Sequence, residues 1–143
     1  LVPPGEYQVA LVVGDREYVQ PLRVEADPRV PVDGAALDAA LALSRKVVAA
    51  LELQRVAFGE LEEMRKQFGA VKKKTGRAAI AAFEAEDAAA LGAVGGILLD
   101  LQIDLEGTDR APTQPQHEVF ELEAARLERV LAHWETVKSL AFP

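Results

Sequence analysis

The chain has 143 residues, of which 23 are acidic and 16 basic, and its net charge is −7. This balance disfavours nucleic acid as a partner of the whole chain, because a phosphate backbone attracts basic surfaces. The absence of cysteine excludes disulfides and thiolate metal sites. Half of the residues are apolar but only 6% are aromatic, which favours close-packed helices around one core over a sheet-rich domain.

Two further features bear on the cellular setting. The longest uncharged apolar run, residues 88–99, is shorter than the roughly 20 residues that a membrane-spanning helix needs, so no span is predicted. The chain begins at Leu1-Val2-Pro3-Pro4, without an initiator methionine or a charged-then-apolar leader. Such a start favours a fragment or a processed product.

Residues 1–26 are predicted to form a β-hairpin. Apolar residues alternate with polar or small ones over 5–25: Tyr7, Val9, Leu11, Val13, Tyr18, Leu22 and Val24. Gly14-Asp15 suits a two-residue type II′ turn, in which glycine supplies the positive φ. Pro21 cannot donate to a strand ladder, so the second strand is expected at a sheet edge.

A two-stranded hairpin alone is marginally stable in water, so this one is expected either to lie on the helices or to end a larger sheet. The phrase Pro4-Gly5-Glu6-Tyr7 favours the larger sheet. It resembles the start of the penultimate strand in an immunoglobulin-like sandwich, where a tyrosine corner anchors the loop. An ordinary turn before a strand is the alternative.

Residues 27–32 are a proline-rich connector. Proline keeps the residue before it extended, so the sheet and the helices are expected to hold a fixed relative orientation. Beyond it, residues 33–143 are predicted to form an antiparallel, up-down-up three-helix bundle, with helices over about 33–68, 77–106 and 113–140. The predicted fold class is therefore mainly α with a small β part.

The helix over 33–68 is the element on which the others are expected to pack. Its apolar residues recur at three- and four-residue steps, with Ser44 and Arg55 filling two gaps: Leu37, Leu41, Val48, Leu51, Phe58, Leu61, Met64 and Phe68. Asp33 is the predicted N-cap and Gly69 the predicted C′ residue. A helix of this length spans about 50 Å and needs partners of similar length.

The segment 69–76 is predicted to be a loop that carries Lys72-Lys73-Lys74. We interpret it as a solvated loop whose charge balances an acidic surface, and a basic docking patch is the alternative. The helix that follows is predicted to begin near Arg77.

This second helix is predicted as one continuous element over about 77–106. Large apolar residues hold the helical spacing: Ile80, Phe83, Leu91, Val94, Leu98, Leu101 and Leu105. Gly92, Gly95 and Gly96 lie inside it, and each costs about 1 kcal/mol of helix propensity relative to alanine. Such a cluster predicts a kink or close packing between helices, and we expect close intramolecular packing.

The third helix has the clearest start in the chain. Thr113 and Gln116 form a capping box, and Pro115 is tolerated in the first turn. Its apolar stripe is broad enough to face two helices at once: Val119, Phe120, Leu127, Val130, Leu131, Trp134 and Val137.

No catalytic, cofactor-binding or metal-binding residue is predicted. His117 and His133 lie far apart on the last helix, without a second histidine or a carboxylate at metal-ligand spacing. The acid pairs Glu62-Glu63 and Glu84-Glu86 do not face each other on a helix, so we interpret them as solvated faces rather than a general acid and base.

The serines, the glycine cluster and the single tryptophan do not form a recognisable catalytic or ligand-binding motif either. Ser44 and Ser139 lack an exposed turn and an identifiable partner base. The glycines at 92–96 lack the strand-loop-helix setting and the lysine of a phosphate loop. Trp134 is interpreted as a core residue.

Both ends of the chain resemble a known family. Pro4-Gly5-Glu6-Tyr7-Gln8-Val9, Gln20-Pro21-Leu22-Arg23-Val24 and Asp27-Pro28-Arg29 are similar to the region after the β-propeller in bacterial sortilin-like, BNR-repeat proteins described as glycosyl hydrolases or sialidase-like. In that family a Pro-Gly-x-Tyr hairpin ends an immunoglobulin-like segment, and an Asp-Pro-Arg connector leads into C-terminal helices. Asp109-Arg110-Ala111-Pro112-Thr113, followed by a helix with a late tryptophan, is also similar.

The resemblance has limits and implications. The middle helix matches only in being rich in alanine, and the chain contains no propeller blade or Asp-box repeat, so no catalytic or sugar-binding residue is carried over. The resemblance implies an exported parent protein, periplasmic or extracellular, and an accessory role beside the upstream propeller. We therefore expect a non-catalytic C-terminal module without a cofactor. The alternative is a free-standing helical interaction module that self-associates through apolar surface on its long helices.

Overall fold

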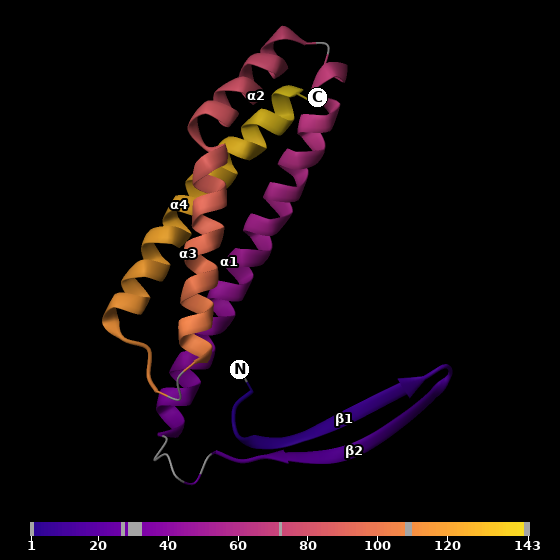
Figure 1. Cartoon of the computed structure of the whole chain (residues 1–143), viewed down its shortest axis with the longest axis vertical. Coiled ribbons are helices and arrows are strands. Elements are labelled where there is room, and N and C mark those ends of the chain that lie inside the picture. Colours follow the sequence, from indigo (N-terminus) through magenta and orange to yellow (C-terminus); the bar gives the residue numbers. More distant parts are fainter. Residues whose placement is uncertain (1, 27, 29–32, 72, 108–109, 142–143) are drawn as a thin grey trace.

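The computed structural model describes residues 2–26, 28, 33–71, 73–107 and 110–141. Over these ranges the chain is mainly helical, with one antiparallel hairpin before the helices (Figure 1), which confirms the predicted fold class. The hairpin consists of β1 (Gly5–Val13) and β2 (Arg16–Val24). The helices are α1 (Gly34–Gln67), α2 (Lys74–Glu86), α3 (Ala88–Glu106) and α4 (Gln114–Ala141), and a short 3₁₀ helix, η1 (Phe68–Ala70), follows α1.

The turn of the hairpin has the predicted geometry. Gly14 has a φ of 60°, and no described residue other than glycine has a positive φ, so the turn fits type II′ and not type I′. Within the described ranges β1 and β2 pair only with each other, so Pro21 lies in an edge strand. The connector at 27–32 lies outside the described residues except for Pro28, and the stiff joint therefore stays a prediction.

The helices are arranged as three legs. α1 runs along the whole bundle, α2 and α3 together return, and α4 runs back beside them (Figure 1). α3 packs against α1 and α4, and α2 packs against α4. All four helices contribute to one core, whose largest fully buried side chains are Trp134, Phe83, Leu61, Leu91 and Leu98.

The two ends of α1 are formed differently from each other. Asp33 is the N-cap as predicted, because its carboxylate accepts a hydrogen bond from the Ala35 amide at 3.1 Å. Gly69 does not take the predicted left-handed C′ conformation, and the chain tightens into η1 instead. The Arg77 guanidinium donates to the carbonyl oxygens of Val71 at 2.8 Å and Gly69 at 3.2 Å. An arginine from the next helix thus satisfies carbonyl groups near this end.

The buried face of α1 is rotated from the predicted stripe. Its buried residues are Leu37, Ala40, Leu43, Ser44, Val47, Ala50, Ala57, Leu61 and Met64. Val48, Phe58 and Phe68 are exposed, although the spacing placed them in the stripe. Small side chains let neighbouring helices approach α1 closely, so the contact follows its alanines rather than several of its larger residues.

The predicted middle helix is two helices. α2 begins at Lys74, earlier than the predicted 77, so Lys73 and Lys74 lie at an exposed helix start and not in a loop. The break lies at Asp87, with φ −119° and ψ −20°, and not at the glycines. All seven predicted apolar residues of this segment are buried.

The three glycines of α3 differ in their surroundings. A Cβ atom on Gly95 would lie 2.7 Å from the Gln54 side chain, whose Nε2 donates to the Leu91 carbonyl at 3.0 Å. A Cβ on Gly92 would just reach Phe58 at 4.0 Å, and one on Gly96 would meet nothing within 4 Å. The prediction of close helix packing is therefore confirmed at Gly95 alone.

α3 is also the one described helix that is long and apolar enough to cross a membrane, judged by length and composition. The uncharged run 88–99 is short, but the helix continues to Glu106. In the structure α3 packs against α1, α2 and α4, with 33% of its apolar window buried. A core helix of a bundle meets the same criteria, so they do not establish a membrane span.

The start of α4 confirms the capping box. The Thr113 amide donates to Gln116 Oε1 at 2.6 Å, and the Gln116 amide donates to Thr113 Oγ1 at 3.4 Å. Leu127, Trp134 and most of the predicted stripe are buried or partly buried, whereas Val119 is exposed.

Candidate functional site

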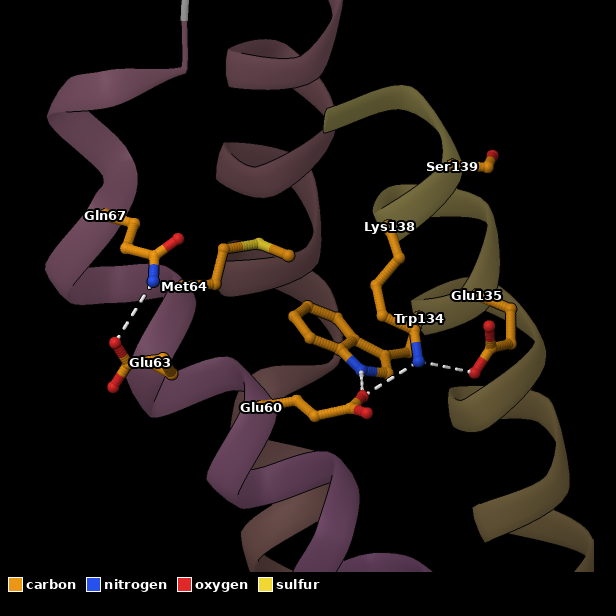
Figure 2. A pocket seen from close by; sticks show the side chains of 8 residues that line it. All are labelled: Glu60, Glu63, Met64, Gln67, Trp134, Glu135, Lys138 and Ser139. Atoms are coloured by element: carbon orange, nitrogen blue, oxygen red, sulfur yellow. Dashed lines mark hydrogen bonds and ion pairs between the residues drawn. The ribbon is translucent and has the colours of Figure 1, made fainter. Parts of the chain in front are cut away.

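The candidate site is an open depression of about 510 Å³ between α1 and α4. It is lined by Glu60, Glu63, Met64, Gln67, Trp134, Glu135, Lys138 and Ser139 (Figure 2). Its centre is the Glu60 carboxylate, toward which Trp134 and Lys138 point from α4. Trp134 Nε1 and Lys138 Nζ each donate to Glu60 Oε2 at 2.8 Å.

The charges in this depression stabilise each other. The hydrogen bond from Lys138, with the one from Trp134, lowers the pKa of Glu60 below its usual value. Burial acts to lower the pKa of Lys138, but the ion pairs with Glu135 and Glu60 outweigh it and raise the pKa. Both groups are therefore held in their charged forms at neutral pH.

This arrangement is poorly suited to proton transfer or nucleophilic attack. A carboxylate whose pKa is lowered is a weak general base and is deprotonated when a general acid is needed. An ammonium group that is held protonated cannot attack an electrophile. The cluster therefore acts as a link between α1 and α4, in which a buried indole finds the hydrogen-bond partner that it needs.

A second charged cluster links α1 to α2. Arg65 donates through Nε and Nη2 to the two carboxylate oxygens of Glu84, both at 2.7 Å, and Nη1 contacts Glu62. Such a two-pronged contact is the stronger geometry for an arginine and a carboxylate. The interpretation of Glu84 as a solvated residue was therefore wrong, because it considered only neighbours on the same helix, whereas Glu62 contacts Arg65 within α1. Glu63 contacts Lys66 and Gln67 on its own helix.

The Arg65–Glu84 contact predicts a pH dependence of stability. The hydrogen bond from Arg65 lowers the pKa of Glu84 below its usual 4.5, so this contribution is complete above about pH 4.5 and is lost as the pH falls through the folded-state pKa. We expect Glu84→Gln to lose less stability than the unmodified chain between about pH 7 and about pH 3. Urea unfolding at the two pH values measures this. The exposed Glu86→Gln is the control, and equal losses in all three proteins would contradict the expectation.

His133 on α4 contacts both the core and Asp87, the residue at which α2 ends and α3 begins. Its Nδ1 lies 2.5 Å from Asp87 Oδ2, and its ring packs edge-on against Phe83 with centroids 5.3 Å apart. Asp87 makes no side-chain cap for α3, because its carboxylate is directed to α4. His133 is partly buried.

The serines are hydrogen-bonded within the helices. Buried Ser44 accepts from Gln102 Nε2 at 2.8 Å, and Ser139 donates to the Thr136 carbonyl at 2.8 Å. Gln102 Oε1 and Glu123 Oε2 are buried without a hydrogen-bond partner in the described part of the chain. Neither buried polar residue was identified from the sequence, where both fall within ordinary helical stretches.

The histidines and acidic residues do not assemble a metal site in the described ranges, where no group of three or more could hold an ion. His117 is partly buried near the start of α4, and the glycines at 92–96 lie inside α3 rather than in a loop. Comparison with family models, curated proteins and solved structures finds no match to this chain. The resemblance to the sortilin-like, BNR-repeat proteins therefore stays a prediction.

Proposed function

We propose that this chain is a non-catalytic structural module of a larger protein, in which the hairpin completes a β-sandwich and the helical bundle supports it. The observation that carries the proposal is the uncovered apolar face of the hairpin. β1 and β2 pair with each other, and the hairpin projects away from the bundle (Figure 1). A two-stranded sheet with an uncovered apolar face is marginally stable in water.

The register separates the residues of the hairpin onto two unequal faces. Tyr7 pairs with Leu22, Leu11 with Tyr18, and the intervening residues point to the other side. One face therefore carries seven apolar residues, Tyr7, Val9, Leu11, Val13, Tyr18, Leu22 and Val24, together with Gly5, Arg16 and Gln20. The other carries Glu6, Gln8, Ala10, Val12, Glu17, Val19, Pro21 and Arg23. A face this apolar is typical of the inside of a sandwich, where a second sheet covers it.

The start of β1 supports a sandwich in particular. The Tyr7 hydroxyl donates to the Pro3 carbonyl at 2.6 Å, which is the backward contact of a tyrosine corner. A Cβ atom on Gly5 would lie 3.4 Å from the Tyr7 ring. The ring thus folds back over the chain that leads into the strand, as it does at the corner of an immunoglobulin-like sandwich.

The resemblance described above supplies the wider setting. On that resemblance, the larger protein is an exported sortilin-like, BNR-repeat β-propeller protein, and this module lies C-terminal to the propeller. The paired charges between the helices support a scaffold rather than an active site, because they leave neither a free base nor a free nucleophile in the depression described above.

Two neighbouring substitutions test the proposal in the longest natural polypeptide that contains this sequence. Leu11 is 60% exposed and Val12 is 66% exposed, yet they lie on opposite faces of the hairpin. We expect Leu11→Lys to lower the free energy of unfolding of that polypeptide by about 1.5–3 kcal/mol, the value of burying a leucine. Val12→Lys is expected to change it by less than about 0.5 kcal/mol.

Hydrogen exchange provides the direct readout. The backbone amides of β1 and β2 are expected to exchange rapidly in residues 1–143 alone and slowly in the longer polypeptide. Equal effects of the two lysine substitutions would overturn the proposal. So would a natural polypeptide with no further strands to cover the hairpin.

A further inference from the structure

α1 carries exposed valines on the side opposite its buried face. Val48 and Val56 are 45% and 53% exposed, although they lie in the middle of a 34-residue helix. A helix that is apolar on opposite sides is normally covered on both. The core uses one side of α1, and this second side is open to solvent.

The open side follows a regular heptad spacing. Alternating steps of four and three residues connect exposed positions that we call the outer seam: Arg45, Ala49, Glu52, Val56, Gly59 and Glu63. Gly59 costs about 1 kcal/mol of helix propensity relative to alanine, yet a Cβ atom there would meet nothing within 4 Å. No described part of the chain uses the space, whereas a second helix that packs closely against the seam would use it.

The charges on the outer seam are complementary to those on the outer seam of a second copy that runs antiparallel to it. Antiparallel alignment about position 54 places Arg45 opposite the second copy's Glu63, and Ala49 opposite its Gly59. It also places Glu52 opposite Val56, where Glu52 is neutralised by Arg55 at 3.0 Å. Arg45 is exposed and has no ion pair among the described residues, so its charge is available to the other copy.

Glu63 is available as well. Its side chain is 58% exposed, and its contact with Lys66 at 3.2 Å is a surface pair within one turn of the helix, which contributes little stability and is readily exchanged. Because the whole chain carries a charge of −7, two copies repel each other overall. A close approach therefore requires local attraction, and the two symmetric Arg45–Glu63 pairs supply it.

From these observations we propose that the outer seam of α1 pairs antiparallel with the outer seam of a second copy, which gives a two-fold symmetric dimer. Two-fold pairing is the commonest arrangement of identical subunits, and it places the same residues on both sides of the interface. Val48 lies beside the seam and would be covered by the second copy. The proposal is independent of the hairpin, whose apolar face lies on another element.

Charge-reversal variants test the pairing. The unmodified chain is expected to form a dimer in sedimentation equilibrium at micromolar concentration. Arg45→Glu places four carboxylates at the two contacts, and Glu63→Arg places four cations there, so each variant alone is expected to associate at least tenfold more weakly. An equimolar mixture of the two variants restores both opposite-charge contacts and is expected to dimerise again.

Controls separate loss of pairing from loss of folding. Circular dichroism must show the same helix content in all variants, and Glu121→Arg on α4 changes the charge equally without touching the seam. Because the chain has no cysteine, a single Ala42→Cys variant at an exposed position outside the seam can carry a spin label without removing a seam charge. Antiparallel pairing places the two labels about 36 Å apart along the helix axis, from 1.5 Å per residue, whereas parallel pairing brings them together.

A monomer at about 100 μM would overturn the proposal, because that concentration is far above the dissociation constant of a stable dimer. A mixture that fails to restore the dimer, or labels that lie side by side, would also overturn it. A dimer that is insensitive to Arg45→Glu would place the interface elsewhere and would also overturn it. None of these results bears on whether the hairpin is covered, so the two proposals fail separately.

Discussion

Replacement of Trp134 with alanine is expected to lower the free energy of unfolding by about 3–5 kcal/mol, the range found for large aromatic residues in cores. Trp134 is 1% exposed, and its ring packs against Phe83 with centroids 4.9 Å apart. The substitution also removes the indole donor from Glu60. The first loss acts at the contact of α4 with α2 and the second at its contact with α1, so the effect is expected to be among the largest of any single substitution.

The measurement and its controls follow from the composition of the chain. Trp134 is the only tryptophan, so unfolding must be followed by circular dichroism rather than by fluorescence. Trp134→Phe keeps most of the ring and loses the hydrogen bond, with an expected cost nearer 1–2 kcal/mol, roughly the value of one bond to a charged group with some lost packing. The exposed Phe58→Ala serves as a control of similar chemistry. An equal cost for Phe58→Ala and Trp134→Ala would contradict the assignment of the core.

Gly76→Ala is expected to destabilise the chain by about 1–3 kcal/mol, the usual cost of inserting a carbon into a filled space. A Cβ atom there would lie 2.8 Å from Ala141 Cα and 2.9 Å from the Leu140 carbonyl oxygen. Both are backbone atoms, so relief requires the start of α2 to move away from the end of α4.

Gly96→Ala provides the matched control, because it adds the same methyl group to a helical glycine with open space around it. It is expected to stabilise the chain by up to about 1 kcal/mol through helix propensity alone. Urea unfolding of the two variants should therefore shift the midpoint in opposite directions. Shifts of the same sign would show that the contact between α2 and α4 is not as close as the structure places it.

Local chemistry determined much of the fold from the sequence alone. Asp33 and the Thr113–Gln116 capping box mark helix starts within one or two residues, because a cap satisfies backbone groups in its own turn. Gly14 marks the hairpin turn because glycine readily adopts the positive φ that the turn requires. The apolar spacing of the α3 segment also identified its large buried apolar residues correctly, since large side chains occupy one face there.

Tertiary structure decided the features that depend on residues far apart in the sequence: which helix faces are buried, where helices end and which charges pair. The sequence placed Val48 and Phe58 in the buried stripe of α1, whereas the alanines meet the other helices, because the closest approach of helices depends on both surfaces at once. The ending of α1 under Arg77, the break at Asp87 beside His133, and the contacts of Glu60 and Glu84 all join residues from different helices.

In the candidate site, too, the sequence predicted one part and only the tertiary structure determined the other. The sequence identified Trp134 as a core residue, and burial of an indole requires a hydrogen-bond partner, but nothing in the spacing shows that this partner is Glu60 on α1. Sequence periodicity describes one helix at a time, while the rotation of each helix about its axis is set only when all the legs pack together. For that reason the sequence by itself determined the elements and their order, and the tertiary structure decided which faces are buried and which charges meet.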